Sequence, residues 1–116
     1  MVKKITFIDL FAGIGGFRYS LSQCGCECVF SSEINEACKQ VYLKNYGEMP
    51  AGDITKIPAS DIPDFDILCA GFPCQPFSIC GKKKGFDDTR GTLFFDICRI
   101  IEEKQPKVVF LETLNI

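Results

Sequence analysis

A cysteine between two prolines is the residue of this sequence best suited to chemistry. Cys74 stands in segment 71–78, which reads GFPCQPFS and follows the apolar run 66–70 directly. Proline fixes φ and removes a backbone donor, so we expect a stiff loop that presents one thiol at the end of a strand. Such a thiol could act as a nucleophile, although a free cysteine is more often a small buried apolar residue. On this loop alone both interpretations stay open.

Three acids could bind or protonate a ligand. Glu33 and Glu112 each end an apolar run, and Asp53 follows Gly52. Glu33 comes about 20 residues after Gly13, where an acid can accept hydrogen bonds from both hydroxyls of a bound ribose. Asp53 could accept a hydrogen bond from the amino group of an adenine. The alternatives are a solvated carboxylate that caps the next helix for Glu33 and a simple Asx turn for Asp53.

A glycine-rich segment follows the first apolar run. Residues 12–16, AGIGG, are called here the glycine loop; they come directly after the β-prone run 5–11 and before apolar residues at helical spacing. The spacing predicts a helix that begins near Gly15 or Gly16. Strand, glycine loop and helix form the first half of a nucleotide-binding unit, in which glycines allow close approach of a ligand. Arg18 replaces the third glycine of the dinucleotide fingerprint, which argues against a pyrophosphate site.

The remaining pattern supplies the elements that must position these side chains. Apolar runs predict further strands at 27–33, 66–70 and 107–112, and segment 52–55 a strand end or turn. Residues 36–46 predict a helix that ends at Gly47, with an apolar face of Ala37, Cys38, Val41 and Tyr42. This order predicts an α/β fold with a doubly wound, mostly parallel sheet, whose carboxyl edge gathers Glu33, Asp53, Cys74 and Glu112 in one crevice.

A long polar loop, 78–90, is predicted to precede one more helix that Pro106 ends. In that helix the apolar residues are predicted to face inward and the charged ones outward. The inward set is Leu93, Phe94, Ile97, Ile100 and Ile101, and the outward set is Asp96, Arg99, Glu102 and Glu103. Cys98, like Cys28 and Cys69, lies beside apolar residues and is predicted to be buried.

Composition limits the function classes. The chain of 116 residues is 47% apolar with net charge −2, which fits one globular domain or part of one and gives no overall basic footprint for nucleic acid. The local exception is Lys82, Lys83 and Lys84, followed by Arg90. Neither a signal peptide nor an apolar run of about 20 residues is recognised, so we expect a cytoplasmic protein. The eight cysteines lack zinc-ligand spacing and there is no histidine, so no metal is expected.

In this order the motifs resemble those of the cytosine-5 DNA methyltransferases, most closely bacterial modification enzymes of restriction systems. The resemblance rests on FAGIGG at 11–16, Glu33, GDI at 52–54, GFPCQPFS at 71–78, RGTLF at 90–94 and FLE at 110–112. It runs through essentially all of residues 1–116. It implies the amino-terminal part of a catalytic domain with the Rossmann-like fold of S-adenosylmethionine-dependent methyltransferases.

The resemblance also implies roles for individual residues. Cys74 would be the nucleophile that attacks a cytosine flipped out of double-stranded DNA, and Glu112 would contact that cytosine. The residues implied for S-adenosyl-L-methionine are Phe11, Gly13, Gly15, Glu33, Ile34, Asp53, Ile54 and Leu93. Those implied for the DNA backbone are Ser78, Lys82, Lys83, Lys84 and Arg90. The base that removes the carbon 5 proton of cytosine is not identified.

Two departures from the family are apparent. Thr113 and Leu114 follow Glu112 where the family usually has Asn-Val. The further strands, the DNA-recognition domain and the closing segment of the cofactor pocket are not found in residues 1–116, so the lone chain is expected to be weak or inactive.

Three rival interpretations stay open. The first is a non-catalytic cofactor-binding half that needs a carboxy-terminal partner chain. The second is a nicotinamide or flavin oxidoreductase, and the third is a redox protein in which Cys80 resolves Cys74.

Overall fold

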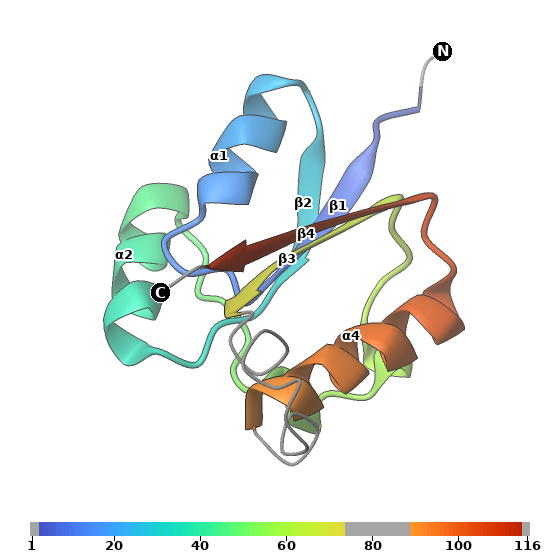
Figure 1. Cartoon of the computed structure of the whole chain (residues 1–116). Coiled ribbons are helices and arrows are strands. Elements are labelled where there is room, and N and C mark those ends of the chain that lie inside the picture. Colours follow the sequence, from blue (N-terminus) through green and yellow to red (C-terminus); the bar gives the residue numbers. More distant parts are fainter. Residues whose placement is uncertain (1–2, 74–88, 115–116) are drawn as a thin grey trace.

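The computed structural model describes residues 3–73 and 89–114 of the chain (Figure 1). Within these residues one parallel sheet has the strand order β2-β1-β3-β4. Its strands are β1 (Thr6–Leu10), β2 (Glu27–Ser31), β3 (Ile67–Pro73) and β4 (Val108–Leu114). The predicted α/β class with a parallel sheet is confirmed.

Three α-helices and two 3₁₀ turns connect the described strands. They are α1 (Gly16–Gln23), α2 (Glu36–Tyr46), η1 (Ile54–Lys56), η2 (Ala59–Asp61) and α4 (Thr89–Lys104). The predicted start of α1 and both ends of α2 are confirmed, and Gly47 follows α2 in the left-handed conformation, with φ 75°. The helix can end in this way because a residue without Cβ adopts positive φ at low cost.

Of the two alternatives predicted for 52–55, a strand end or a turn, the structure has the turn. Ser32 and Ala51 form only an isolated parallel bridge, and the chain then turns into η1. The Asp53 side chain accepts hydrogen bonds from the backbone N–H and the hydroxyl of Thr55, at 3.0 and 2.7 Å. This capping replaces the extended conformation that a strand would need.

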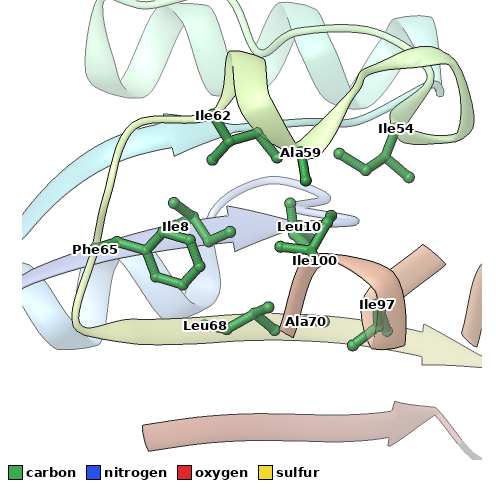
Figure 2. Close-up of a cluster of buried hydrophobic side chains, with 10 residues drawn as sticks. All are labelled: Ile8, Leu10, Ile54, Ala59, Ile62, Phe65, Leu68, Ala70, Ile97 and Ile100. Atoms are coloured by element: carbon green, nitrogen blue, oxygen red, sulfur yellow. The ribbon is translucent and has the colours of Figure 1, made fainter. Parts of the chain in front are cut away.

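Helices cover both faces of the sheet. On one face, Ile8 and Leu10 of β1 belong with Ile97 and Ile100 of α4 to one buried cluster (Figure 2). Its other members come from β3 and the two 3₁₀ turns with their flanks: Ile54, Ala59, Ile62, Phe65, Leu68 and Ala70. On the opposite face Phe7 packs with residues of α1. Because side chains alternate along a strand, β1 is buried on both faces, as its apolar run predicted.

Some predicted helix faces and one predicted burial are wrong. In α2 only Tyr42 is buried, whereas Ala37 and Val41 are exposed. In α4 Asp96 is only 9% exposed and accepts a hydrogen bond from Arg99 at 2.8 Å, although both were predicted to face outward. Arg99 also donates to the carbonyl of Ile54 at 2.7 Å, so its guanidinium reaches η1, and Asp96 is buried beside it. Helical periodicity does not reveal this neighbour.

Cys98 of α4 was predicted to be buried, but it is exposed. Cys69 is buried as predicted, and Cys28 is only partly so. Cys98 lies on a side of α4 that faces away from the sheet. The neighbouring Ile97 faces the sheet and is buried.

The strand order places a reversal of winding beside β1. The chain passes from β1 to β2 on one side and then returns to β3 on the other side. The helices that follow β1 and β3 in the chain, α1 and α4, pack on opposite faces of the sheet, and ligands of α/β sheets bind at such a reversal. A ligand site is therefore expected at the carboxyl ends of β1 and β3.

Candidate active site

A hollow of about 500 Å³ lies at the carboxyl ends of β1, β3 and β4. Its lining comes from the end of β1, the glycine loop, α1 and the facing strands: Phe11, Ala12, Gly13, Ile14, Gly16, Phe17, Ser20, Gly71 and Glu112. Glu112 lies next to Gly71, since its Oε1 is 3.8 Å from the place that a Cβ on Gly71 would take. The glycine loop and the predicted acid thus share one hollow.

A smaller hollow of about 40 Å³ holds most of the predicted cofactor residues. Its lining is Phe11, Ser32, Glu33, Ile34, Gly52, Asp53, Ile54 and Leu93. Phe11 lines both hollows, so they lie side by side. The fold therefore brings together residues that follow β1 and β2, residues at the start of η1, and one residue of α4. Of the predicted cofactor residues, only Gly13 and Gly15 are missing from this lining, and Gly13 lines the larger hollow.

Glu33 joins the glycine loop to the loop after β2. Its Oε1 accepts a hydrogen bond from the backbone N–H of Gly13 at 2.7 Å, and its Oε2 accepts one from the N–H of Asn35 at 2.9 Å. Asn35, not Glu33, caps α2, through a bond from the N–H of Cys38. An ionised carboxylate has about four acceptor sites. Glu33 can therefore hold both loops and still accept hydrogen bonds from ligand hydroxyls.

Asp53 occupies the Asx turn that the sequence offered as the simpler interpretation. The hydrogen bonds from the hydroxyl and the backbone N–H of Thr55 lower the pKa of Asp53, so its carboxylate is ionised at neutral pH. Both bonds end on Oδ1. Asp53 is thus a preformed acceptor beside Ile54, which is buried, and Ile34, which is 68% exposed.

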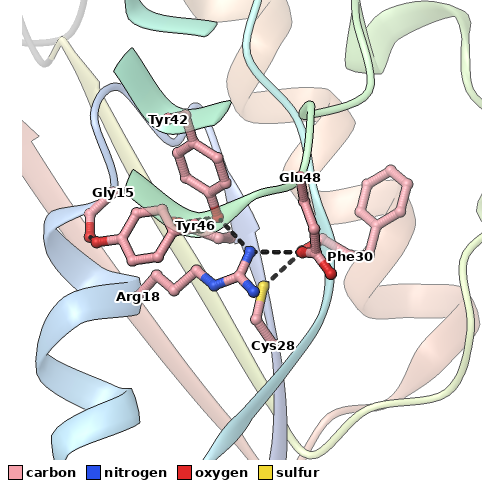
Figure 3. A network of polar contacts seen from close by, with 8 residues as sticks. Gly15, Arg18, Cys28, Phe30, Tyr42, Tyr46 and Glu48 are labelled. Atoms are coloured by element: carbon pink, nitrogen blue, oxygen red, sulfur yellow. Dashed lines mark hydrogen bonds and ion pairs between the residues drawn. The ribbon is translucent and has the colours of Figure 1, made fainter. Parts of the chain in front are cut away.

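A polar network lies beside the glycine loop (Figure 3). Nη1 of Arg18 donates to Oε1 of Glu48 at 2.7 Å and to the hydroxyl of Tyr42 at 3.4 Å. The guanidinium also lies over the rings of Tyr42 and Tyr46, 5.6 and 4.8 Å from their centroids. Sequence reasoning used Arg18 only as a departure from a fingerprint and missed this network.

Asp9 in β1 is the buried end of this network. It is 1% exposed, and Oδ2 accepts a hydrogen bond from the hydroxyl of Tyr42 at 3.1 Å. Oδ1 has no hydrogen-bond partner among the described residues. Burial is the main cause that raises the pKa of Asp9 to about 7. The available signal was a single acid inside the otherwise apolar run 5–11.

Several predicted site residues cannot be placed. Cys74, Ser78, Lys82, Lys83 and Lys84 lie outside the described residues. Arg90 belongs to the first turn of α4.

The described residues form neither a metal-ligand cluster nor a membrane-spanning helix. Within 3–73 and 89–114 no group of three or more His, Cys, Asp or Glu side chains could hold a metal ion. In the same ranges no helix combines the length and the apolar character needed to cross a bilayer.

Replacing Gly15 with alanine should destabilise the fold by about 2–4 kcal/mol, from strain at positive φ and from overpacking. Gly15 has φ 95°, and a Cβ there would strike the ring of Tyr46. The matched control is Gly16→Ala, because a Cβ at Gly16 would meet no heavy atom within 4 Å. The control should change stability by less than about 1 kcal/mol. Urea unfolding measures both, and equal midpoints would contradict the packing described here.

Comparison with known proteins agrees with this arrangement. The profile described as C-5 cytosine-specific DNA methylase matches residues 5–115. Type II methyltransferase M.HhaI of Haemophilus parahaemolyticus is 63% identical over 111 residues, which are 96% of this chain and 34% of that protein. Type II methyltransferase M.HpaII of Haemophilus parainfluenzae is 58% identical over 115 residues, 97% of this chain and 32% of that protein. The chain spans about a third of the length of these relatives.

Solved structures give the same fold. The Entamoeba histolytica methyltransferase EhMeth superposes with a TM-score of 0.83 at 27% identity, over 97% of this chain and 39% of that one. A putative DNA modification methyltransferase encoded within an Escherichia coli prophage gives a TM-score of 0.78 at 24% identity, over 97% of this chain and 32% of that one.

Proposed function

This chain belongs to the C-5 cytosine-specific DNA methylase family, and from that premise we propose that it forms the cofactor site and catalytic loop of a DNA cytosine-5 methyltransferase of a restriction-modification system. The reaction would move a methyl group from S-adenosyl-L-methionine to carbon 5 of a cytosine, on DNA in the bacterial cytoplasm. The observation that supports this most is the gathering of Phe11, Glu33, Ile34, Asp53, Ile54 and Leu93 around one hollow beside the glycine loop.

The hydrogen-bond acceptors and apolar side chains that line the two hollows fit S-adenosylmethionine. Glu33 has acceptor capacity left for ribose hydroxyls, and Asp53 has an ionised carboxylate that suits an adenine amino group. Ile34 and Leu93 offer apolar surface for the purine. The glycine loop leaves the larger hollow open beside Glu112. When bound, the cofactor supplies a methyl group on a positively charged sulfur.

Cys74 and Glu112 are proposed to act on the cytosine. The Cys74 thiolate would form a bond from Sγ to carbon 6, which makes carbon 5 electron-rich enough to accept a methyl group. Glu112, as a carboxylic acid at ring nitrogen 3, would offset the negative charge that develops there. Loss of the carbon 5 proton to a base then allows the sulfur–carbon bond to break. The position of Glu112 in the lining of the larger hollow, beside the glycine loop, supports this role.

The target base must leave the helix, because a thiol cannot reach carbon 6 inside stacked duplex DNA. Ser78, Lys82, Lys83, Lys84 and Arg90 are proposed to hold the phosphate backbone around the flipped cytosine. Such contacts position a protein on DNA without reading its sequence.

A second candidate is a non-catalytic cofactor-binding half that needs a partner chain. The observation that favours it is β4, at the end of the strand order, where four consecutive apolar side chains are exposed: Val108, Val109, Phe110 and Leu111. An apolar edge strand is normally paired or covered. For this second candidate we propose that a carboxy-terminal partner chain covers the β4 edge.

The function can be tested by mixing this chain with the part of M.HhaI that lies beyond the matched third. Duplex DNA and S-adenosylmethionine with a tritiated methyl group are added, and label in the DNA is counted. We expect label only when both polypeptides are present, and none with Cys74→Ala in place of the parent chain. Binding of S-adenosylhomocysteine without any methyl transfer would favour the non-catalytic half. Absence of binding would contradict the proposed cofactor site.

A further inference from the structure

We propose that Tyr46, held by Arg18, is a positioning residue for the glycine loop. It fixes the carbonyl of Gly15 so that the flanking residues Gly13, Ile14 and Gly16 face the larger hollow. The proposal rests on the function proposed above, since it assumes that the glycine loop lies against S-adenosylmethionine. Tyr46 itself is absent from the linings of both hollows. It would therefore act on the ligand through the loop.

Tyr46 contacts Gly15 in two ways. Its hydroxyl donates to the carbonyl oxygen of Gly15 at 2.7 Å, and its ring fills the space that a Cβ on Gly15 would take. The same carbonyl accepts the N–H of Tyr19 at 2.9 Å, in the first turn of α1. Gly15 is the N-cap of α1, and no side chain of its own caps the helix. Tyr46, from the last turn of α2, thus ties that helix to the start of α1.

The two sides of the glycine loop meet different neighbours. Gly15 is buried against Tyr46, whereas Gly13, Ile14 and Gly16 line the larger hollow. Any shift of the Gly15 carbonyl would move the residues on both sides of it, because peptide planes are rigid and each residue has only two soft dihedral angles. A tilt at Gly15 is therefore transmitted to the ligand side of the loop.

Arg18 keeps the Tyr46 ring in place. Its guanidinium carbon lies 4.8 Å from the centroid of that ring, and its Nη1 is paired with Glu48 at 2.7 Å (Figure 3). The side chain of Arg18 is only 14% exposed. Since Arg18 belongs to α1 and Tyr46 to α2, the stacked pair links the helix that follows the loop to the residue that holds the loop.

Glu33 holds the other end of the loop through the N–H of Gly13. The two anchors differ in one respect. Glu33 lines the small hollow and is proposed to touch the ligand, whereas Tyr46 lines neither hollow. A change at Tyr46 therefore tests positioning without removing a ligand contact.

The test compares Tyr46→Phe with the parent chain by calorimetry with S-adenosylhomocysteine. Tyr46→Phe keeps the ring and the stacking on Arg18 but removes the hydroxyl. Loss of one hydrogen bond that preorganises the loop should weaken binding about 3- to 10-fold. Tyr46→Leu, which also loses the ring, should weaken it further. The matched control is Tyr19→Phe, because the Tyr19 side chain is 63% exposed on α1, and its affinity should equal that of the parent.

Backbone amide resonances of Gly13 and Gly16 give a readout that does not depend on the ligand. In Tyr46→Phe these resonances should shift. The spectrum should remain that of a folded chain, and resonances far from Tyr46 and the glycine loop should not change. Unchanged glycine resonances together with parental affinity would overturn the positioning role. If the parent itself does not bind S-adenosylhomocysteine, the proposed function fails. The glycine resonances would then still test whether Tyr46 positions the loop. Unchanged resonances of Gly13 and Gly16 would overturn that role as well.

Discussion

Replacing Glu33 with alanine is expected to weaken binding of S-adenosylhomocysteine by at least about 100-fold. The carboxylate accepts the N–H groups of Gly13 and Asn35, at 2.7 and 2.9 Å, and is proposed to accept both ribose hydroxyls as well. Hydrogen bonds to a charged group are worth about 1.5–3 kcal/mol each, so losing two ligand bonds costs at least about 3 kcal/mol. Calorimetry of the purified chain measures the loss directly.

Two variants make this experiment specific. Glu36→Ala removes a carboxylate three residues further along. This carboxylate is exposed, and among the described residues its polar contacts are Gln40 and Lys39. We expect it to bind within about twofold of the parent, as a surface change should. Glu33→Gln keeps one acceptor oxygen but replaces the other with an N–H₂ group, so an intermediate loss is expected. A folded Glu33→Ala chain with parental affinity would refute the ribose role.

The stability of the chain should fall as pH rises from about 4 to about 7, and Asp9 should cause about 4 kcal/mol of that fall. Burial raises its pKa from 3.8 to about 7 in the folded chain. Between these values the folded state binds more protons than the unfolded state, so the free energy of unfolding decreases with rising pH. Each pH unit in this interval is worth about 1.4 kcal/mol. Below about 4 and above about 7, Asp9 contributes no further pH dependence.

Asp9→Asn should remove this contribution, because the amide has nearly the same shape and does not titrate. From pH 4 to pH 8 the unfolding free energy of the parent should fall by about 4 kcal/mol more than that of the variant. Urea unfolding at several pH values gives that difference. The control is Asp64→Asn, since the Asp64 side chain is 99% exposed and its ion pair among the described residues is with Lys104 at 3.5 Å. Parallel pH profiles for the parent and Asp9→Asn would show that Asp9 is ionised in the folded chain throughout.

The main elements could be predicted from short segments of the sequence, whereas most of the residues around the smaller hollow were expected only from the family resemblance. The start of α1, the bounds of α2 and the parallel strands follow from signals that lie within a few residues of each other, such as the run 5–11 or the glycine after Tyr46. Local periodicity and glycine chemistry are properties of short segments, so they survive without tertiary information. Glu33 was singled out by its distance along the chain from Gly13, and the fold joins the two through a hydrogen bond.

Only the tertiary structure decided which charged groups are buried and what they hold. Asp96 and Arg99 read as a solvated helix face, yet Arg99 holds the carbonyl of Ile54, 45 residues away in the chain. Asp9 and Tyr42 are 33 residues apart, and Tyr46 and Gly15 are 31 apart. Contacts at such separations depend on where the crossovers place each helix against the sheet. Residue types and spacing therefore determined the parallel sheet and its main helices, whereas the packing of α1 and α2 decided how the glycine loop is held.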